Sequence, residues 1–183
     1  DYDRAIGDFD TAISLNPRHA LAYNNRGIAY ANERKFDLAI RSYDGAIGLD
    51  VGYAGAYNNR GYAYARTGAY DRAVDDFTTA IALNPRDALA YRNRARVYQN
   101  LSRYDFAIAD YRRALALRPS ESAAQGLKVS EALLAAKTRE EEEGEAEAET
   151  ASFRQMPNTD LSGTLIGKAA ASSLDECEAA CAK

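Results

Sequence analysis

The sequence predicts an all-α protein in which helical hairpins stack one upon another, and three observations lead to that prediction. The first is a 34-residue period: blocks 20–53, 54–87 and 88–121 share one pattern, and residues 1–19 match the second half of another block. The second is that aromatic and small residues recur three and four positions apart. The third is a proline near the end of most blocks. A period of this length is typical of a repeat array.

Each block contains two helices, because its aromatic and small residues fall on two separate helical faces. Tyr57, Gly61 and Tyr64 lie four and three residues apart and so share one face. Small residues beside large rings let two helices approach closely. Pro85 cannot continue the second helix and marks its end. We therefore expect helices over residues 1–15, 20–33, 36–49, 54–67, 70–83, 88–101 and 104–117.

Residues 1–121 resemble the tetratricopeptide repeat family, both in period and in the Tyr, Gly, Ala, Phe and Pro residues at the constant places. The resemblance implies a right-handed superhelical solenoid in which the first helix of each repeat lines a concave groove. The departures from the family pattern are Ala95, Val51, Arg34 and Ser102. The last two stand where Gly68 is the more usual residue, which predicts a weakened turn.

The chain changes composition twice after the last block. Residues 122–137 continue the helical pattern without the constant residues, and we expect a capping helix, since an array needs a terminal cap. Residues 138–152 are rich in Glu, which favours helix but repels when clustered, so we expect an acidic linker of frayed helix. Residues 153–183 contain turn-forming residues and both cysteines of the chain.

The C-terminal segment resembles the start of a PAN/apple domain, which is a small α+β fold. Phe153, residues 158–163 and the run from Ser173 to Cys177, followed by Cys181, carry the resemblance. It implies that Cys177 and Cys181 form disulfide bonds with cysteines beyond residue 183. The chain begins within a repeat and ends two residues after Cys181, so we expect it to be part of a longer protein.

Composition excludes several classes of function. The net charge is −4, but residues 1–121 carry 17 Lys and Arg against 15 Asp and Glu. A near-neutral array argues against a broad nucleic-acid surface, and no run of about 18 apolar residues indicates a membrane span. The sequence has no Gly-rich phosphate loop, no Ser-His-Asp set and no metal-binding cluster. We therefore expect no cofactor, no metal and no catalytic activity.

The family resemblance assigns particular places of each first helix to the groove, counted from the start of each block, and these places carry amides and arginines. We therefore predict a peptide-binding set of Asn24, Asn25, Asn58, Asn59, Tyr62, Arg66, Arg92, Asn93 and Arg96. An amide offers both a donor and an acceptor, which suits the main chain of an extended peptide. The carboxylate clamp of chaperone-binding members is a poor match, since it needs Lys and Asn where Asn24 and Ile28 stand.

Asparagine recurs once per block at the sixth place, as Asn25, Asn59 and Asn93. Asn is a mediocre helix former, so its repetition calls for a reason. The pattern resembles the asparagine ladder of the nucleocytoplasmic O-linked N-acetylglucosamine transferases, which implies main-chain contacts to an extended ligand. The alternative is that these amides solvate the groove or bond a neighbouring helix. At the seventh place, arginines are expected to bond neighbouring helices instead of a ligand: Arg26, Arg60 and Arg94.

The leading hypothesis is a non-enzymatic scaffold that binds an extended protein segment in the groove of the array. The alternative is the substrate-recruiting region of a larger enzyme whose catalytic domain lies outside residues 1–183. Disulfides in a PAN/apple domain need an oxidising compartment, which favours a periplasmic or extracellular location; without that domain the location would be cytoplasmic. Self-association is also expected through the first helix, where Ile6, Phe9 and Ile13 should lie partly bare.

Overall fold

A computed structural model describes the backbone of residues 1–155 and the side chains of residues 1–151. The secondary-structure elements in this range are all α-helices, as predicted. They are α1 (Tyr2–Leu15), α2 (Ala20–Asn32), α3 (Phe36–Leu49), α4 (Ala54–Arg66), α5 (Tyr70–Leu83), α6 (Ala88–Asn100), α7 (Tyr104–Leu117) and α8 (Glu121–Gln155). The bounds of α1 to α7 agree with the sequence prediction to within one residue. None of the helices described has both the length and the hydropathy that a membrane span requires.

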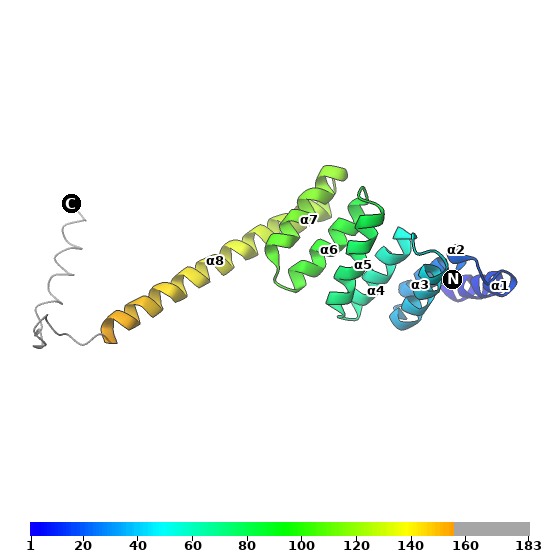
Figure 1. Cartoon of the computed structure of the whole chain (residues 1–183), viewed down its shortest axis with the longest axis horizontal. Coiled ribbons are helices and arrows are strands. Elements are labelled where there is room, and N and C mark those ends of the chain that lie inside the picture. Colours follow the sequence, from blue (N-terminus) through cyan, green and yellow to red (C-terminus); the bar gives the residue numbers. More distant parts are fainter. Residues whose placement is uncertain (156–183) are drawn as a thin grey trace, which may run out of the picture. The chain divides into compact units, whose positions relative to one another are not determined.

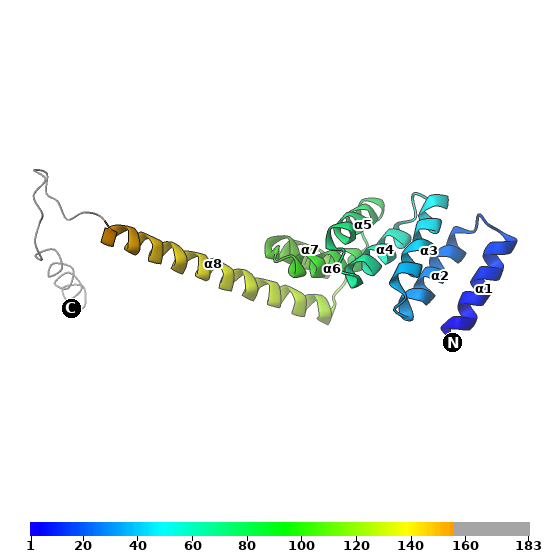
Figure 2. The same ribbon diagram turned by 90° about the horizontal axis from the view of Figure 1, so that it is seen from below.

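The chain forms two structural units, residues 1–136 and residues 137–183. Within the first unit the helices pair in chain order, α2 with α3, α4 with α5 and α6 with α7 (Figure 1). Consecutive hairpins then stack, so that α1 contacts α2, α3 contacts α4 and α5 contacts α6 (Figure 2). The core is therefore a series of small clusters between neighbouring helices, as expected of a repeat array.

Two of the hairpins close where an aromatic ring of the second helix lies on a glycine of the first. A Cβ atom on Gly27 would lie 2.5 Å from the ring of Tyr43, and a Cβ on Gly61 would lie 3.0 Å from the ring of Phe77. The rings themselves are buried, with Tyr43 2% and Phe77 0% exposed. The small residue at the eighth place thus permits the close helix approach that the sequence pattern predicted.

The turn inside each hairpin contains a residue with positive φ. The φ angles are 62° at Arg34, 83° at Gly68 and 55° at Ser102. The following backbone N–H then closes the helix, as when the N–H of Lys35 donates to the carbonyl of Tyr30 at 2.9 Å. Only glycine adopts this conformation without a Cβ clash, so Arg34 and Ser102 strain their turns. The positive φ at these two residues gives a physical reason for the weakened turns, which stay a prediction.

The first helix is better covered than the sequence analysis expected. Ile6 is only 9% exposed, because α1 packs against α2. The expectation that Ile6 lies partly bare is therefore wrong. Phe9 and Ile13 are half-buried, so the apolar surface offered by α1 is smaller than the sequence alone suggested.

Helix α8 continues well beyond the predicted capping helix. Its first part packs on the last hairpin, where Ala123 and Leu127 join the cluster around Tyr111. It begins after the three-residue loop 118–120, whereas the earlier loops between hairpins have four residues. The helix then runs through the acidic segment in place of the expected frayed linker. Ala and Glu are good helix formers there, and a Lys137–Glu141 ion pair of 3.7 Å adds support.

The segment that resembles a PAN/apple domain lies almost wholly outside the described residues. Residues 153–155 belong to α8, where the sequence analysis expected turns and short extended pieces. Cys177 and Cys181 lie outside the described residues, so their disulfide bonds remain a prediction.

Candidate functional site

The predicted peptide-binding residues all lie on the first helices of the three hairpins. Six come from the fifth and sixth places of α2, α4 and α6, and the remaining three, Tyr62, Arg66 and Arg96, come from later places of α4 and α6. We call the surface that these residues share the groove face; its members are Asn24, Asn25, Asn58, Asn59, Tyr62, Arg66, Arg92, Asn93 and Arg96. Neighbouring first helices touch along it, α2 against α4 and α4 against α6. The array therefore brings together side chains that are up to 72 positions apart in the chain.

Asparagine side chains connect each hairpin to the next across the groove face. Asn59 Nδ2 donates to Asn24 Oδ1 at 3.0 Å, and Asn93 Nδ2 donates to Asn58 Oδ1 at 3.2 Å. In each pair the sixth place of one repeat donates to the fifth place of the repeat before it. Asn24 Nδ2 in turn donates to Asn25 Oδ1 at 3.3 Å. Part of the hydrogen-bonding capacity that was assigned to a ligand thus links neighbouring helices.

Burial divides these asparagines into two groups. Asn24, Asn58 and Asn93 are 4%, 5% and 6% exposed, whereas Asn25 and Asn59 are half-buried. Within the described residues, Nδ2 of Asn25 and Oδ1 of Asn59 have no hydrogen-bond partner. Asn24 and Asn58 therefore act mainly as supports, and the half-buried amides retain capacity for another molecule.

The seventh-place arginines bond neighbouring helices, as the sequence analysis expected. Arg60 forms a two-point ion pair with Asp76, with distances of 2.8 Å from Nε and 2.7 Å from Nη2, and its Nη1 lies 2.6 Å from Asp44. Arg94 pairs in the same way with Asp110 at 2.7 and 2.9 Å. Partners lie 16 residues before and after each arginine, so one side chain joins three helices.

The groove-face arginines have a different environment. Arg66 Nη1 donates to the hydroxyl of Tyr62 at 2.9 Å, and its guanidinium lies 5.2 Å from the centroid of the Phe36 ring. Arg96 lies 5.8 Å from the centroid of the Tyr62 ring, and Arg92 donates to Ser122 at 3.2 Å. Among the described residues, none of these three arginines has a carboxylate within 4.0 Å. The groove face therefore carries three cations without acidic partners.

Two cavities open on the groove face at opposite ends of the array. One, of about 210 Å³, is lined by Arg92, Asn93, Arg96, Tyr111 and Ser122. The other, of about 230 Å³, is mainly apolar and lies between α1 and α2, where its lining includes Asn25 and Ile28. The groove face thus has a cationic end at α6 and an apolar end at α2.

The pKa of Tyr111 depends on the charges at the cationic end of the groove face. Burial raises the pKa of its hydroxyl above the ordinary value, while the positive charges of Arg96 and Arg92 act in the opposite direction. The hydroxyl also donates to Gln99 Oε1 at 2.7 Å. The two arginines therefore hold a positive potential at the base of this cavity.

Tyr111, Ser122 and Arg118 line these cavities or their neighbour but are absent from the predicted peptide-binding set. Tyr111 lies in the core, where it is 3% exposed, and it also lines the cationic cavity. Arg118 departs from the repeat pattern, because Asn16, Asp50 and Asn84 occupy its place in the other blocks. This departure was a signal in the sequence from which Arg118 could have been named as a candidate site residue. The described residues contain no group of three or more metal-binding side chains.

Comparison with protein families identifies the array. Two models of the tetratricopeptide repeat match the chain, one over residues 1–56 and the other over residues 54–87 and 88–121. The chain belongs to the tetratricopeptide repeat family. A search of curated proteins found no match.

Solved structures with the same fold include two tetratricopeptide domains related to RPAP3. The first such domain of human RPAP3 is 30% identical with a TM-score of 0.65, over 68% of this chain and 98% of that one. The first repeat domain of Spaghetti (RPAP3), solved with the HSP90 peptide SRMEEVD, is 31% identical with a TM-score of 0.62, over 63% and 93%. MamA, at 24% identity and a TM-score of 0.67 over 85% and 87%, shares the fold.

Proposed function

We propose that the array is a protein-interaction scaffold whose groove face binds an extended, acidic peptide segment of a partner protein. The observation that carries the proposal is the contrast between two sets of arginines on the same helices. Seventh-place arginines are neutralised by aspartates, whereas Arg66, Arg92 and Arg96 have no acidic partner among the described residues. Unneutralised cations along one surface favour a ligand that supplies the missing carboxylates.

The asparagines allow this surface to form hydrogen bonds with a peptide backbone. With Asn25 Oδ1 and Asn59 Nδ2 already bonded to Asn24, Nδ2 of Asn25 can still donate to a ligand and Oδ1 of Asn59 can still accept from one. An extended peptide presents alternating N–H and C=O groups. The amide N–H of an asparagine can donate to the peptide C=O, and the amide oxygen can accept from the peptide N–H. The inter-repeat bonds also fix the orientation of the amides before a ligand arrives, which lowers the entropic cost of binding.

The solved relative with a bound peptide supports this proposal. The Spaghetti (RPAP3) domain binds the HSP90 peptide SRMEEVD, which contains three acidic residues and one arginine. The relative covers most of the array at 31% identity. We extend the chemistry of that ligand, a peptide rich in acidic residues, to this chain, and leave the identity of its partner open.

The proposal assigns no catalytic step to the described residues, and the array acts by recruiting its partner. We also propose that residues 153–183 form the start of a PAN/apple recognition module, with Cys177 and Cys181 bridged to cysteines elsewhere in the protein. Self-association through α1 would require Phe9 and Ile13 to be uncovered further, since Ile6 is already buried.

A peptide-library selection tests the proposal. The full chain is immobilised and offered ten-residue peptides, and affinities of the selected peptides are measured by fluorescence anisotropy. We expect Asn25→Ala with Asn59→Ala to weaken binding about tenfold, since each net hydrogen bond contributes about 0.5–1.5 kcal/mol. Arg66→Ala with Arg96→Ala should remove the preference for acidic peptides and flatten the dependence of affinity on salt.

Two controls accompany this selection. Arg18→Ala removes an exposed arginine from the loop before α2, which is not a member of the groove face, and should leave selection unchanged. Thermal unfolding of each variant checks that the array stays folded. If the four groove-face substitutions together leave the same peptides bound with the same affinity, the groove face is not the binding site.

A further inference from the structure

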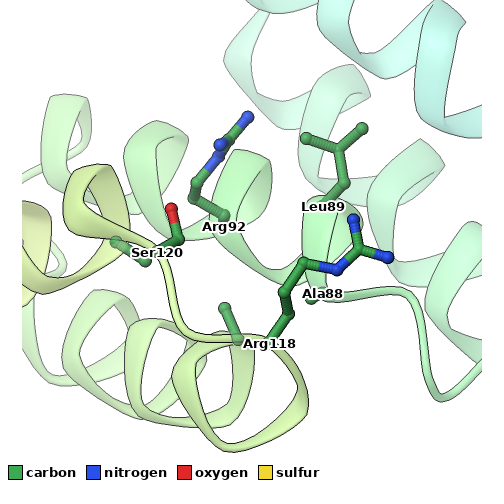
Figure 3. Close-up of a pocket in the computed structure, with 7 residues that line it drawn as sticks. Ala88, Leu89, Arg92, Arg118 and Ser120 are labelled. Atoms are coloured by element: carbon green, nitrogen blue, oxygen red, sulfur yellow. The ribbon is translucent and has the colours of Figure 1, made fainter.

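A further cavity, separate from the two on the groove face, lies beside its cationic end, where α6, α7 and α8 meet. Its volume is about 130 Å³, and its lining consists of Ala88, Leu89, Arg92, Ala114, Arg118, Ser120 and Ala123. Figure 3 shows the side chains of Arg92 and Leu89 extending from α6, with Arg118 and Ser120 on the loop that follows α7. Arg92 also lines the cationic cavity of the groove face, so these two cavities are neighbours.

The repeat pattern does not require an arginine at position 118. In the other blocks Asn16, Asp50 and Asn84 hold this place, and each accepts a hydrogen bond from the backbone N–H two residues later, at 3.1, 2.9 and 3.3 Å. These side chains therefore stabilise their own loops. Arg118 has no acceptor group and cannot form this bond. Its loop is also one residue shorter than the other three.

Arg92 is a second departure from the pattern in the same cavity. The fifth place holds Asn24 and Asn58 in the preceding repeats, and both side chains accept a bond from the next first helix. Arg92 instead donates to Ser122, whose hydroxyl lies 3.0 Å from that of Ser120. Neither Arg92 nor Arg118 has a carboxylate within 4.0 Å among the described residues.

We infer that this cavity, which we call the side cavity, receives a glutamate or aspartate side chain of the bound peptide, with its carboxylate between Arg92 and Arg118. The inference rests on the proposed peptide-binding function and names a specificity site within it. The walls of Ala88, Leu89, Ala114 and Ala123 would contact the methylene groups, while the guanidiniums of Arg92 and Arg118 and the Ser120 hydroxyl, which line the same cavity, would bind the carboxylate. An acidic side chain matches this combination of apolar walls and cationic rim.

The chemistry of the lining favours a carboxylate over a phosphate group. A phosphate exposes polar oxygens in all directions, and four of the seven lining residues have no polar side-chain atom to meet them. A carboxylate carries its two oxygens at one end of an apolar stem, so the stem can lie against the alanines. Because Arg92 borders both cavities, a peptide on the groove face can place one such side chain here.

The test compares peptides that differ at one acidic position. Peptides selected by the full chain are resynthesised with amidated C termini, and each Glu or Asp is replaced in turn by Gln or Asn. At one position we expect the replacement to weaken binding to the natural chain about tenfold, as charge-assisted bonds to two arginines are lost. The same replacement should change binding to Arg118→Asn less than twofold.

Arg118→Asn is a suitable variant because Asn already occupies this place in two other loops. Thermal unfolding should show the variant to be as stable as the natural chain. Arg18→Ala, which removes one positive charge elsewhere, should keep the full tenfold discrimination. Arg92→Asn, again the residue of the other repeats, should reproduce the effect of Arg118→Asn if both arginines hold the same carboxylate.

The outcomes separate this inference from the proposed function. If Arg118→Asn keeps full discrimination at every acidic position, the side cavity is not a specificity site, even though the groove face binds peptides. If binding needs a free C-terminal carboxylate, or if phosphoserine binds more tightly than glutamate through Arg118, the assignment to an acidic side chain is wrong. If the natural chain selects no peptide, the proposed function fails and this inference fails with it.

Discussion

Arg94 and Arg96 lie two positions apart on α6, yet their surroundings differ completely. Arg94 is held by Asp110 at 2.7 and 2.9 Å and by Thr78 at 2.9 Å, all from second helices. Arg96 is exposed on the groove face and lies over the ring of Tyr62. Two positions turn a helix by about 200°, so one arginine faces the second helices and the other faces the groove.

The difference shows how a repeat protein separates stability from binding. The face toward the second helices is nearly constant, because every repeat must stack on its neighbours in the same way. On the groove side the buried asparagines also join the repeats, but the ninth place makes fewer stacking contacts and varies from Ile28 to Tyr62 to Arg96. Changes on the first face should therefore alter the free energy of unfolding, and changes on the second should alter binding.

The largest expected effect comes from removing the most completely paired arginine. Arg60→Ala should lower the free energy of unfolding by about 3 kcal/mol, because it leaves the carboxylate of Asp76, 5% exposed, without a partner. Arg66→Ala, on the groove face of the same helix, should change stability by less than about 0.5 kcal/mol. Chemical denaturation of both variants measures the contrast. Equal losses of unfolding free energy in the two variants would contradict the assignment of stability to one face of α4 and of binding to the other.

A smaller gain in stability should follow from completing the pairing of the first hairpin. Arg26 bonds Asp10 at 2.6 Å and Ser42 at 3.1 Å, whereas Arg60 and Arg94 each meet an aspartate at the place of Ser42. Ser42→Asp should therefore raise the free energy of unfolding by about 1 kcal/mol, provided the new carboxylate pairs with Arg26. Ser42→Asn is the matched control of similar size and no charge. A loss of stability with Asp and not with Asn would show that burial of the charge outweighs the pairing.

The smallest effect concerns the pKa of Tyr111, which reports the charge on the groove face. Because Arg92 and Arg96 lower this pKa against the raising effect of burial, Arg92→Asn with Arg96→Ala should raise it further. A folded-state pKa above the unfolded value stabilises the protein below about pH 10, and that stability is lost as pH rises further. The double variant should therefore lose more stability than the natural chain at alkaline pH.

The pKa of Tyr111 can be followed by NMR of tyrosine labelled with carbon-13 at Cζ, and Arg112→Ala is the control for a charge outside the groove face. An unchanged pKa in the double variant would mean that the two arginines do not set the potential at this cavity.

The sequence predicted the fold closely because the interactions that define each hairpin are local. The period, the small residue at the eighth place and the aromatic rings of the second helix are enough to place α1 to α7 within one residue. The bonding of Arg26, Arg60 and Arg94 to neighbouring helices was also predictable, because a helix pair of fixed length brings positions 16 apart together. The conformation of residues 121–155 was harder to predict, because strong helix formers favour a helix there while clustered like charges oppose it. In the structure these residues form the helix α8.

The sequence by itself therefore determined the repeat array, the order of its helices and the surface on which a ligand should be sought. The tertiary structure decided how the polar groups on that surface are used. It joined Asn59 to Asn24 across two repeats, and it brought Arg118 from a loop into one cavity with Arg92. The physical reason is that side-chain hydrogen bonds depend on the positions of individual atoms, which stacking and loop length set, whereas helix pairing depends on a pattern that repetition makes visible in the sequence.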